Sequence, residues 1–143
     1  EIELPIMSVV ELFDNHDNLK KWQPGLMRIE NIDGEPGQVG TRSRLFFKMG
    51  KREIEMIETV TKRDLPYEYF CTYRTKGVYN VVKNKFYPLS QFRTRFETEN
   101  EFRFSGWMKL LGILMPGSFK RQTQKSLNDF KKFAESEYSN RKK

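Results

Sequence analysis

Glu58 is the acidic residue whose neighbours in the sequence best suit it to act as a general acid or base. In an alternating strand, Glu58 shares one face with Ile54, Met56 and Val60, all of them apolar. Burial among such side chains raises the pKa of a carboxyl group because it disfavours the charged form, and such a group can act as a general acid or base. Glu58 is therefore the candidate catalytic residue, although a bulge near Ile57 would turn it outward.

Histidine and cysteine, the other residues that often act in catalysis or hold metals, each occur once in the 143 residues. His16 lies among Asn and Asp between two short helices, a setting typical of a solvated loop residue. Cys71 takes an inward strand position, where a thiol usually packs as a small apolar group, and no base is apparent for it. We therefore expect no metal and no cofactor.

Alternating apolar and polar residues predict a series of strands across the middle of the chain. The turns between them are short, and parallel neighbours would need crossovers of about a dozen residues or more. The strands should therefore form an antiparallel meander. The predicted strands cover residues 26–33, 41–49, 52–61, 67–74, 78–87 and 92–104.

A long amphipathic helix is predicted over about residues 116–138. Phe119, Leu127 and Phe130 fall on one face of a 3.6-residue period, and that face must be buried. The proline and glycine at its start precede Ser118, whose hydroxyl is a candidate cap. Since strands fill most of the chain upstream, the sheet is the expected partner of this helix.

The first 25 residues are expected to form an edge strand at residues 1–4 and two short helices, at about residues 6–13 and 17–22. The first residue is Glu rather than Met, so we expect further amino-terminal residues to precede it. No linker divides the sequence, and its length suits one domain of residues 1–143. The predicted class is α+β, with a curved antiparallel sheet wrapped around the carboxy-terminal helix.

Four segments of the chain are similar to corresponding pieces of a known family. With them the chain resembles the START-like superfamily, also called SRPBCC, and in particular its polyketide cyclase/dehydrase and lipid transport branch. This resemblance implies the helix-grip fold, with two short helices after the first strand. It also implies a cavity between the sheet and the long helix that holds a hydrophobic or amphipathic small molecule. The segments are Leu19 to Gly25, Gly34 to Thr41, Glu58 to Thr61 and Gly106 to Gly117.

The inward positions of the predicted sheet and helix combine apolar groups with a few hydroxyls and amides, as small-molecule sites do. The alternative is that these side chains fill an ordinary core. Trp22 is expected near the cavity mouth, and Met115 lies on the apolar segment before the long helix. The candidate ligand-binding residues are Trp22, Phe47, Met49, Met56, Tyr69, Tyr73, Asn80, Val82, Thr94, Phe96, Met115, Phe119, Gln122 and Thr123.

The formal net charge is +7, and the last three residues, Arg141 to Lys143, contribute three of these charges. The other Lys and Arg residues are spread along strands beside Glu, which indicates a solvated surface rather than a phosphate-binding stripe. We therefore expect no nucleic-acid partner. The sequence contains no run of 18 apolar residues, so we expect no transmembrane segment. A single cysteine fits a reducing cytoplasm. The apolar segment at residues 105–115 suits transient membrane contact or a second subunit, so a monomer and a homodimer both stay open.

Three functions are consistent with the sequence. The first is binding of a lipid-like or polyketide-like ligand without catalysis. The second is an enzyme of the cyclase, dehydratase or hydrolase type that uses Glu58 and the inward tyrosines. The third is a protein-interaction module whose basic strands and tail contact an acidic partner.

Overall fold

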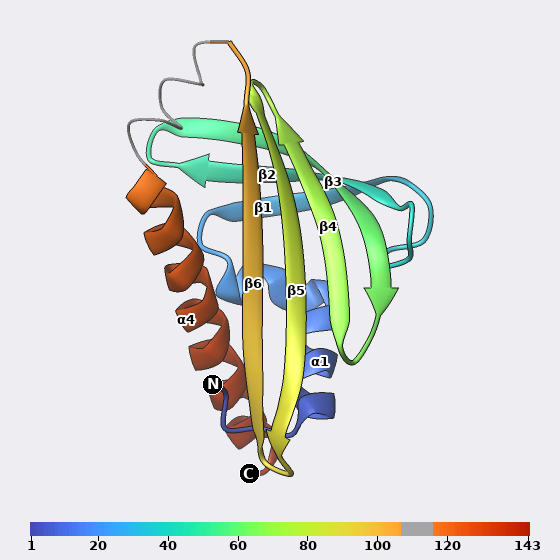
Figure 1. The fold of residues 1–143 in the computed structure, drawn as a ribbon, viewed down its shortest axis with the longest axis vertical. Helices are drawn as coiled ribbons and strands as arrows, with labels where there is room; N and C mark the ends of the chain where they lie inside the picture. The colour runs from blue at the N-terminus through green and yellow to red at the C-terminus, as the bar shows by residue number, and fades with distance from the viewer. Residues whose placement is uncertain (107–115) are drawn as a thin grey trace.

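The computed structural model describes residues 1–106 and 116–143, in which helices lie on the concave side of a curved sheet (Figure 1). The long helix, red in Figure 1, begins at Pro116 and ends three residues beyond the predicted position 138. Ser118 lies inside this helix rather than capping it, because Pro116 already takes a helical position where its missing N–H costs nothing. The helices are α1 (Ile6–Asp14), η1 (His16–Asn18), α2 (Leu19–Trp22) and α4 (Pro116–Arg141).

The sheet has six strands in the order β1-β2-β3-β4-β5-β6, and each neighbouring pair is antiparallel. The predicted meander is therefore confirmed. β1 and β2 cross behind the upper half of β5 and β6, which shows how strongly the sheet curves (Figure 1). The strands are β1 (Leu26–Asp33), β2 (Arg42–Met49), β3 (Arg52–Asp64), β4 (Glu68–Thr75), β5 (Val78–Ser90) and β6 (Arg93–Phe104).

The segment at residues 1–4, where an edge strand was predicted, makes a single β-bridge to β6. Ile2 and Thr94 exchange two backbone hydrogen bonds of 2.8 and 2.9 Å. Pro5 follows three residues later and is the N-cap of α1, so the chain turns into the helix before a strand can extend. Among the described residues, the first strand is therefore β1, which comes after the short helices.

An aromatic cluster packs the lower half of the fold, between the short helices, the sheet and α4. Phe13 of α1 lies at its centre, with ring centroids 5.1 Å from Phe86, 5.7 Å from Phe96 and 5.8 Å from Phe130. These contacts are edge-to-face, the arrangement that the aromatic quadrupole favours. Trp22 completes the cluster with its ring 5.0 Å from Phe130, which is 0% exposed. This cluster fixes the distance between α4 and the sheet.

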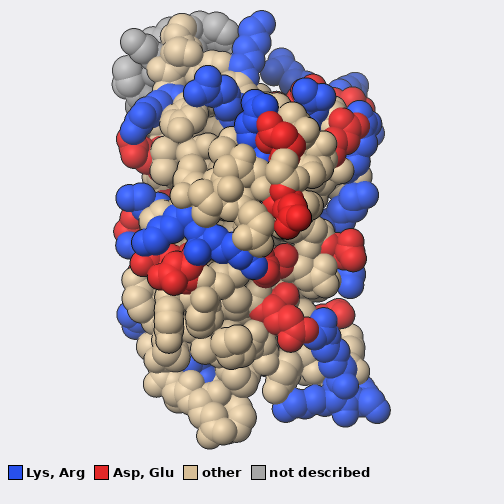
Figure 2. Space-filling model, turned by 90° about the vertical axis from the view of Figure 1, so that its right-hand side faces the viewer, with Lys and Arg blue, Asp and Glu red and all other residues tan. Residues whose placement is uncertain are grey.

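The convex face of the sheet carries Lys, Arg, Asp and Glu side chains interspersed with one another (Figure 2). Many of them form ion pairs between neighbouring strands, such as Arg44 with Glu55 at 2.7 Å and Lys62 with Glu68 at 3.3 Å. Pairs of this exposed kind contribute little to stability, and they divide the surface into small patches of either sign. The predicted solvated surface is therefore what the fold presents on this face.

Candidate functional site

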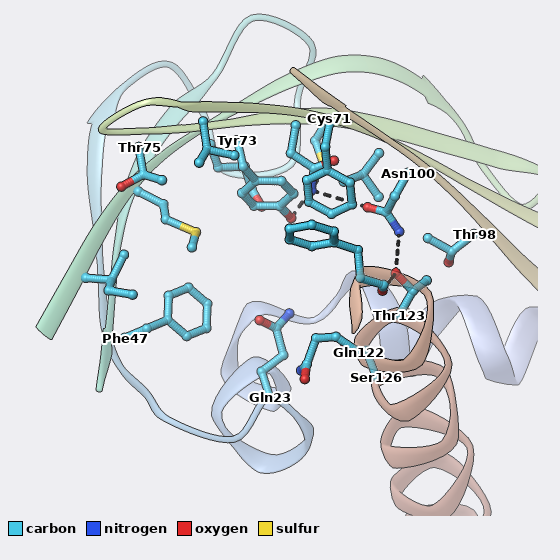
Figure 3. Close-up of a pocket in the computed structure, with 18 of the residues that line it drawn as sticks. Gln23, Phe47, Cys71, Tyr73, Thr75, Thr98, Asn100, Gln122, Thr123 and Ser126 are labelled. Atoms are coloured by element: carbon cyan, nitrogen blue, oxygen red, sulfur yellow. Dashed lines mark hydrogen bonds between the residues drawn. The ribbon is translucent and has the colours of Figure 1, made fainter. Parts of the chain in front are cut away.

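A cavity of about 1390 Å³ lies between the concave face of the sheet, α2 and the amino-terminal half of α4. In Figure 3, Tyr73 and Cys71 reach into it from the sheet, Gln122 and Ser126 from α4, and Gln23 from the end of α2. The aromatic cluster packs α4 against the sheet lower down, whereas Phe119, Gln122 and Ser126 of the upper half of α4 face open space. The alternative of a fully packed core does not apply to the upper half of the fold.

Strand pairing places three polar side chains abreast on the cavity wall. Glu58 of β3 pairs with Tyr73 of β4, which in turn pairs with Asn80 of β5. Directly paired residues of adjacent strands point to the same face, so all three line the cavity. The bulge in β3 falls between Val60 and Lys62, beyond Glu58, and therefore does not turn Glu58 outward.

One hydrogen-bonding neighbour, Tyr73, reaches the carboxyl group of Glu58. The Tyr73 hydroxyl bonds to Glu58, and Cys71 Sγ donates to the Tyr73 hydroxyl at 3.3 Å. Burial raises the pKa of Glu58, while the hydrogen bond from Tyr73 and the charge of His16 act in the opposite direction. Burial also raises the pKa of Cys71 and of Tyr73, so both remain protonated donors. The arrangement gives one carboxyl group able to gain or lose a proton inside the cavity.

A second polar chain crosses from the sheet to α4. Asn80 Nδ2 donates to Asn100 Oδ1 at 3.2 Å, and Asn100 Nδ2 donates to Thr123 Oγ1 at 3.1 Å. The Thr123 hydroxyl in turn donates to the Phe119 carbonyl at 3.0 Å, one helical turn back. These bonds are drawn in part in Figure 3 and fix polar groups at defined points in a largely apolar cavity.

An ion pair between α1 and β3 lies at the edge of the cavity. Arg63 holds Asp14 through two bonds of 2.6 and 2.7 Å and also donates to the Gly37 carbonyl at 3.1 Å. Asp14 lines the cavity beside these bonds. The guanidinium charge of Arg63 is therefore directed at a carboxylate of the fold itself rather than at the cavity.

Most of the candidate ligand-binding residues line the cavity, but Thr94 does not. It is 0% exposed, and its hydroxyl donates to the Leu4 carbonyl at 2.8 Å, because the amino-terminal segment covers this end of β6. The side chains of Met49 and Met115 lie outside the described part of the structure. The candidates on the cavity wall are Trp22, Phe47, Met56, Tyr69, Tyr73, Asn80, Val82, Phe96, Phe119, Gln122 and Thr123.

His16 and Asn100 also line the cavity, although neither was among the candidates. Asn100 continues the inward alternation of Phe96 and Thr98, so the strand pattern could have identified it. His16 begins η1, and Asn15 Oδ1 accepts a hydrogen bond from the following Asp17 N–H at 3.0 Å. No periodic pattern extends into such a short turn, so the sequence indicates only a solvated loop residue, whereas the half-buried His16 lines the cavity.

Metal sites and membrane-spanning helices are not found in the part of the chain that the structure describes. Over residues 1–106 and 116–143, no group of three or more His, Cys, Asp or Glu side chains is placed to hold a metal ion. In the same ranges, no helix has both the length and the apolar character needed to cross a membrane.

The comparisons to known proteins agree with the fold. The family described as polyketide cyclase / dehydrase and lipid transport matches residues 1–135, and the chain belongs to this family. The resemblance inferred from the sequence is thereby confirmed. No match is found among curated protein sequences.

Solved structures confirm the helix-grip fold. The crystal structure of Ara h 8.0201 is similar with a TM-score of 0.76 and 15% identity, covering 94% of this chain and 93% of the other. A conserved protein from Geobacillus kaustophilus gives a TM-score of 0.73 with 14% identity, over 93% and 90% of the two chains. The protein TTHA0849 from Thermus thermophilus gives 0.71 with 15% identity, over 93% and 91%. At such low identities the similarity establishes the fold alone.

Proposed function

We propose that the protein binds a hydrophobic or amphipathic small molecule in the cavity between the sheet and α4. The observation that carries this proposal is the cavity itself, whose volume of about 1390 Å³ exceeds the roughly 300–1,000 Å³ of ordinary small-molecule pockets. A space of that size among aromatic and aliphatic walls favours an apolar occupant, because its transfer from water gains about 25 cal/mol per Å². Membership of a family that includes lipid transport supports the same conclusion.

The cavity wall has two kinds of side chain, apolar ones and hydrogen-bonding ones, which would make different contacts with a ligand. Phe47, Met56, Phe102 and Phe119 present apolar surface to an occupant, while Glu58, Tyr73, Asn80, Asn100 and Thr123 offer hydrogen bonds. Apolar area supplies most of the binding free energy in such a site, and the few polar groups orient the ligand. We therefore expect tight binding of molecules with a large apolar body and a small polar group.

The proposal is tested by narrowing the cavity. Val82 lies on the cavity wall, so Val82→Phe should weaken binding of the neutral fluorescent dye prodan by about tenfold or more by removing space. Val39 is 61% exposed, and Val39→Phe is the matched control with the same added volume. Equal dye binding by both variants and the parent chain would contradict the proposal. Solvent extraction and native mass spectrometry of the purified protein would then identify any natural occupant.

A second candidate function is acid–base catalysis by Glu58 on a ligand in the same cavity. Its support is the position of a carboxyl group with a raised pKa, hydrogen-bonded to Tyr73, on the cavity wall. Such a group can protonate a carbonyl or leaving hydroxyl in its acid form, or remove a proton beside a carbonyl in its ionised form. Glu58→Gln should then abolish turnover of an extracted ligand even at concentrations that saturate the variant. Unchanged turnover would exclude this mechanism.

A further inference from the structure

Of the acidic residues that line the cavity, Glu53 and Glu55 are exposed and Asp14 is paired with Arg63, whereas Glu58 is half-buried and forms no ion pair among the described residues. Arg52 and Lys76 also line the cavity, but both are exposed residues at the ends of strands or in turns. Arg63 is occupied by Asp14 at 2.6 Å. His16 is the basic group whose charge acts on Glu58, and among the described residues no ion pair within 4.0 Å joins the two. The interior thus holds a carboxyl group without a bonded cation from the described chain.

The hydrogen bonds around Glu58 make it an acceptor. The Cys71 thiol donates to the Tyr73 hydroxyl at 3.3 Å, and the Tyr73 hydroxyl bonds to Glu58, so this chain of donors ends at the carboxyl oxygens. A carboxylate has about four lone-pair positions, and Tyr73 occupies one of them. Acceptor positions therefore remain on a side chain that faces the cavity.

We propose that the ligand is an amphipathic amine whose protonated nitrogen donates a hydrogen bond to Glu58 and whose apolar body lies against Phe47, Phe102 and Phe119. This inference rests on the proposed function, because it names the chemical class of the cavity's occupant. A charge-assisted bond between ammonium and carboxylate is about twice as strong as a neutral one, and it is strengthened further where water is excluded. A carboxylic acid ligand would instead place a like charge beside Glu58.

Because the net charge is +7, a preference for amines over carboxylic acids cannot come from the overall charge of the protein. The field of the whole protein attracts anions and repels cations, so an unspecific surface would bind a fatty acid more tightly than a fatty amine. A preference for the amine must therefore come from a local acidic group. Salt reduces the contribution of the surface field, whereas a bond inside the cavity is screened much less.

Three probes with the same apolar body separate the contributions: dodecylamine, dodecanol and dodecanoic acid, each titrated below its micelle concentration near neutral pH. The amine is protonated there, as a lysine ammonium is. We expect dodecylamine to bind about tenfold or more tightly than dodecanoic acid, with dodecanol between them. Glu58→Gln, which keeps the side-chain volume, should remove that preference and leave the affinity for dodecanol within about twofold.

Glu101→Gln is the matched control, because Glu101 is an exposed carboxylate of β6 paired with Arg103. It should leave all three affinities unchanged. Binding of dodecanoic acid as tight as that of dodecylamine, or tighter, would overturn the inference. So would an amine preference that survives Glu58→Gln. In either case, binding of dodecanol would still support the proposed function. Failure of all three probes to compete with prodan would overturn the proposed function itself.

Discussion

Asn100 of β6 donates a hydrogen bond from Nδ2 to Oγ1 of Thr123 at 3.1 Å and so connects the last strand to α4 across the cavity. Asn80 extends this connection to β5, and the Thr123 hydroxyl passes it to the Phe119 carbonyl. These polar groups of the cavity wall therefore connect the helix to the sheet.

Loss of the Thr123 hydroxyl should weaken this connection. Thr123→Val keeps the shape of the side chain but leaves Asn100 Nδ2 without its acceptor, at a cost of about 1 to 2 kcal/mol in the free energy of unfolding. Urea denaturation measures this change. A double-mutant cycle with Asn100→Ala provides the control, because the two effects should be strongly non-additive. Simple additivity would show that the bond does not contribute to stability.

Glu58 should make the stability of the ligand-free protein depend on pH. Its ordinary pKa of 4.5 is raised in the folded state by burial, against the opposing effects of Tyr73 on β4 and His16 on η1. The folded state therefore holds this proton more tightly than the unfolded state. The resulting stabilisation is fully present below pH 4.5 and is lost as the pH rises through the folded-state pKa.

Glu58→Gln removes this dependence because the amide does not ionise. The stability difference between the variant and the parent chain should be constant below pH 4.5. It should shift in favour of the variant as the pH rises from 4.5 through the folded-state pKa, and level off above it. Free energies of unfolding measured by urea titration across this pH range test the sign. Parallel curves for the two proteins would show that Glu58 ionises as freely in the folded state as in the unfolded chain.

Two glycines in the left-handed region should respond differently to a methyl group. Gly25 has φ of 84°, and a Cβ there would lie 2.5 Å from the Lys48 carbonyl oxygen of the neighbouring strand. Gly40 has φ of 88°, with no atom of the described residues within 4 Å of the corresponding position. Gly40→Ala should cost about 1 kcal/mol through backbone strain alone, and Gly25→Ala about 2 to 4 kcal/mol through strain and collision. Equal shifts in thermal unfolding would contradict this difference.

Removal of the Phe130 ring should destabilise the protein far more than removal of an exposed ring. Phe130 is 0% exposed and contacts Phe13, Trp22 and Phe96. Phe130→Ala should therefore cost about 3 to 5 kcal/mol, with incomplete collapse of the space it leaves. Phe92 is 60% exposed, and Phe92→Ala should change the free energy of unfolding by less than about 1 kcal/mol. Similar losses would mean that the aromatic cluster does not carry the stability assigned to it.

The sheet and the long helix could be predicted from the sequence because their periods are regular. Phe96, Thr98 and Phe102 alternate with charged residues, and Phe119, Leu127 and Phe130 repeat at helical spacing. Register then follows from the short turns, so the inward set of the sheet is largely determined. The alternation therefore predicts an inward Tyr73, while the inward position of Glu58 also requires that no bulge precede it in β3.

The remaining parts of the site depend on contacts that no period encodes. Thr94 has the inward alternation of its strand, yet the bridge with Ile2 covers it and removes it from the cavity. His16 belongs to a three-residue turn whose direction depends on the Asn15 cap and on the anchor from Asn18 Nδ2 to the Leu12 carbonyl at 3.1 Å. Such placements depend on individual hydrogen bonds between particular residues, which the periodicity of a sequence does not encode.

The aromatic cluster around Phe13 and Phe130 packs α4 on the sheet, and its members Phe13, Trp22 and Phe96 also form the lower end of the cavity wall. The rings hold the helix on the sheet in the lower half, so cavity-facing positions such as Phe47, Val82 and Gln122 do not have to supply that packing. Substitutions at these positions can change the shape of the cavity without removing the packing of α4 on the sheet. If the proposed function holds, a few substitutions in the upper wall could change the ligand during evolution, while the buried rings preserve the fold.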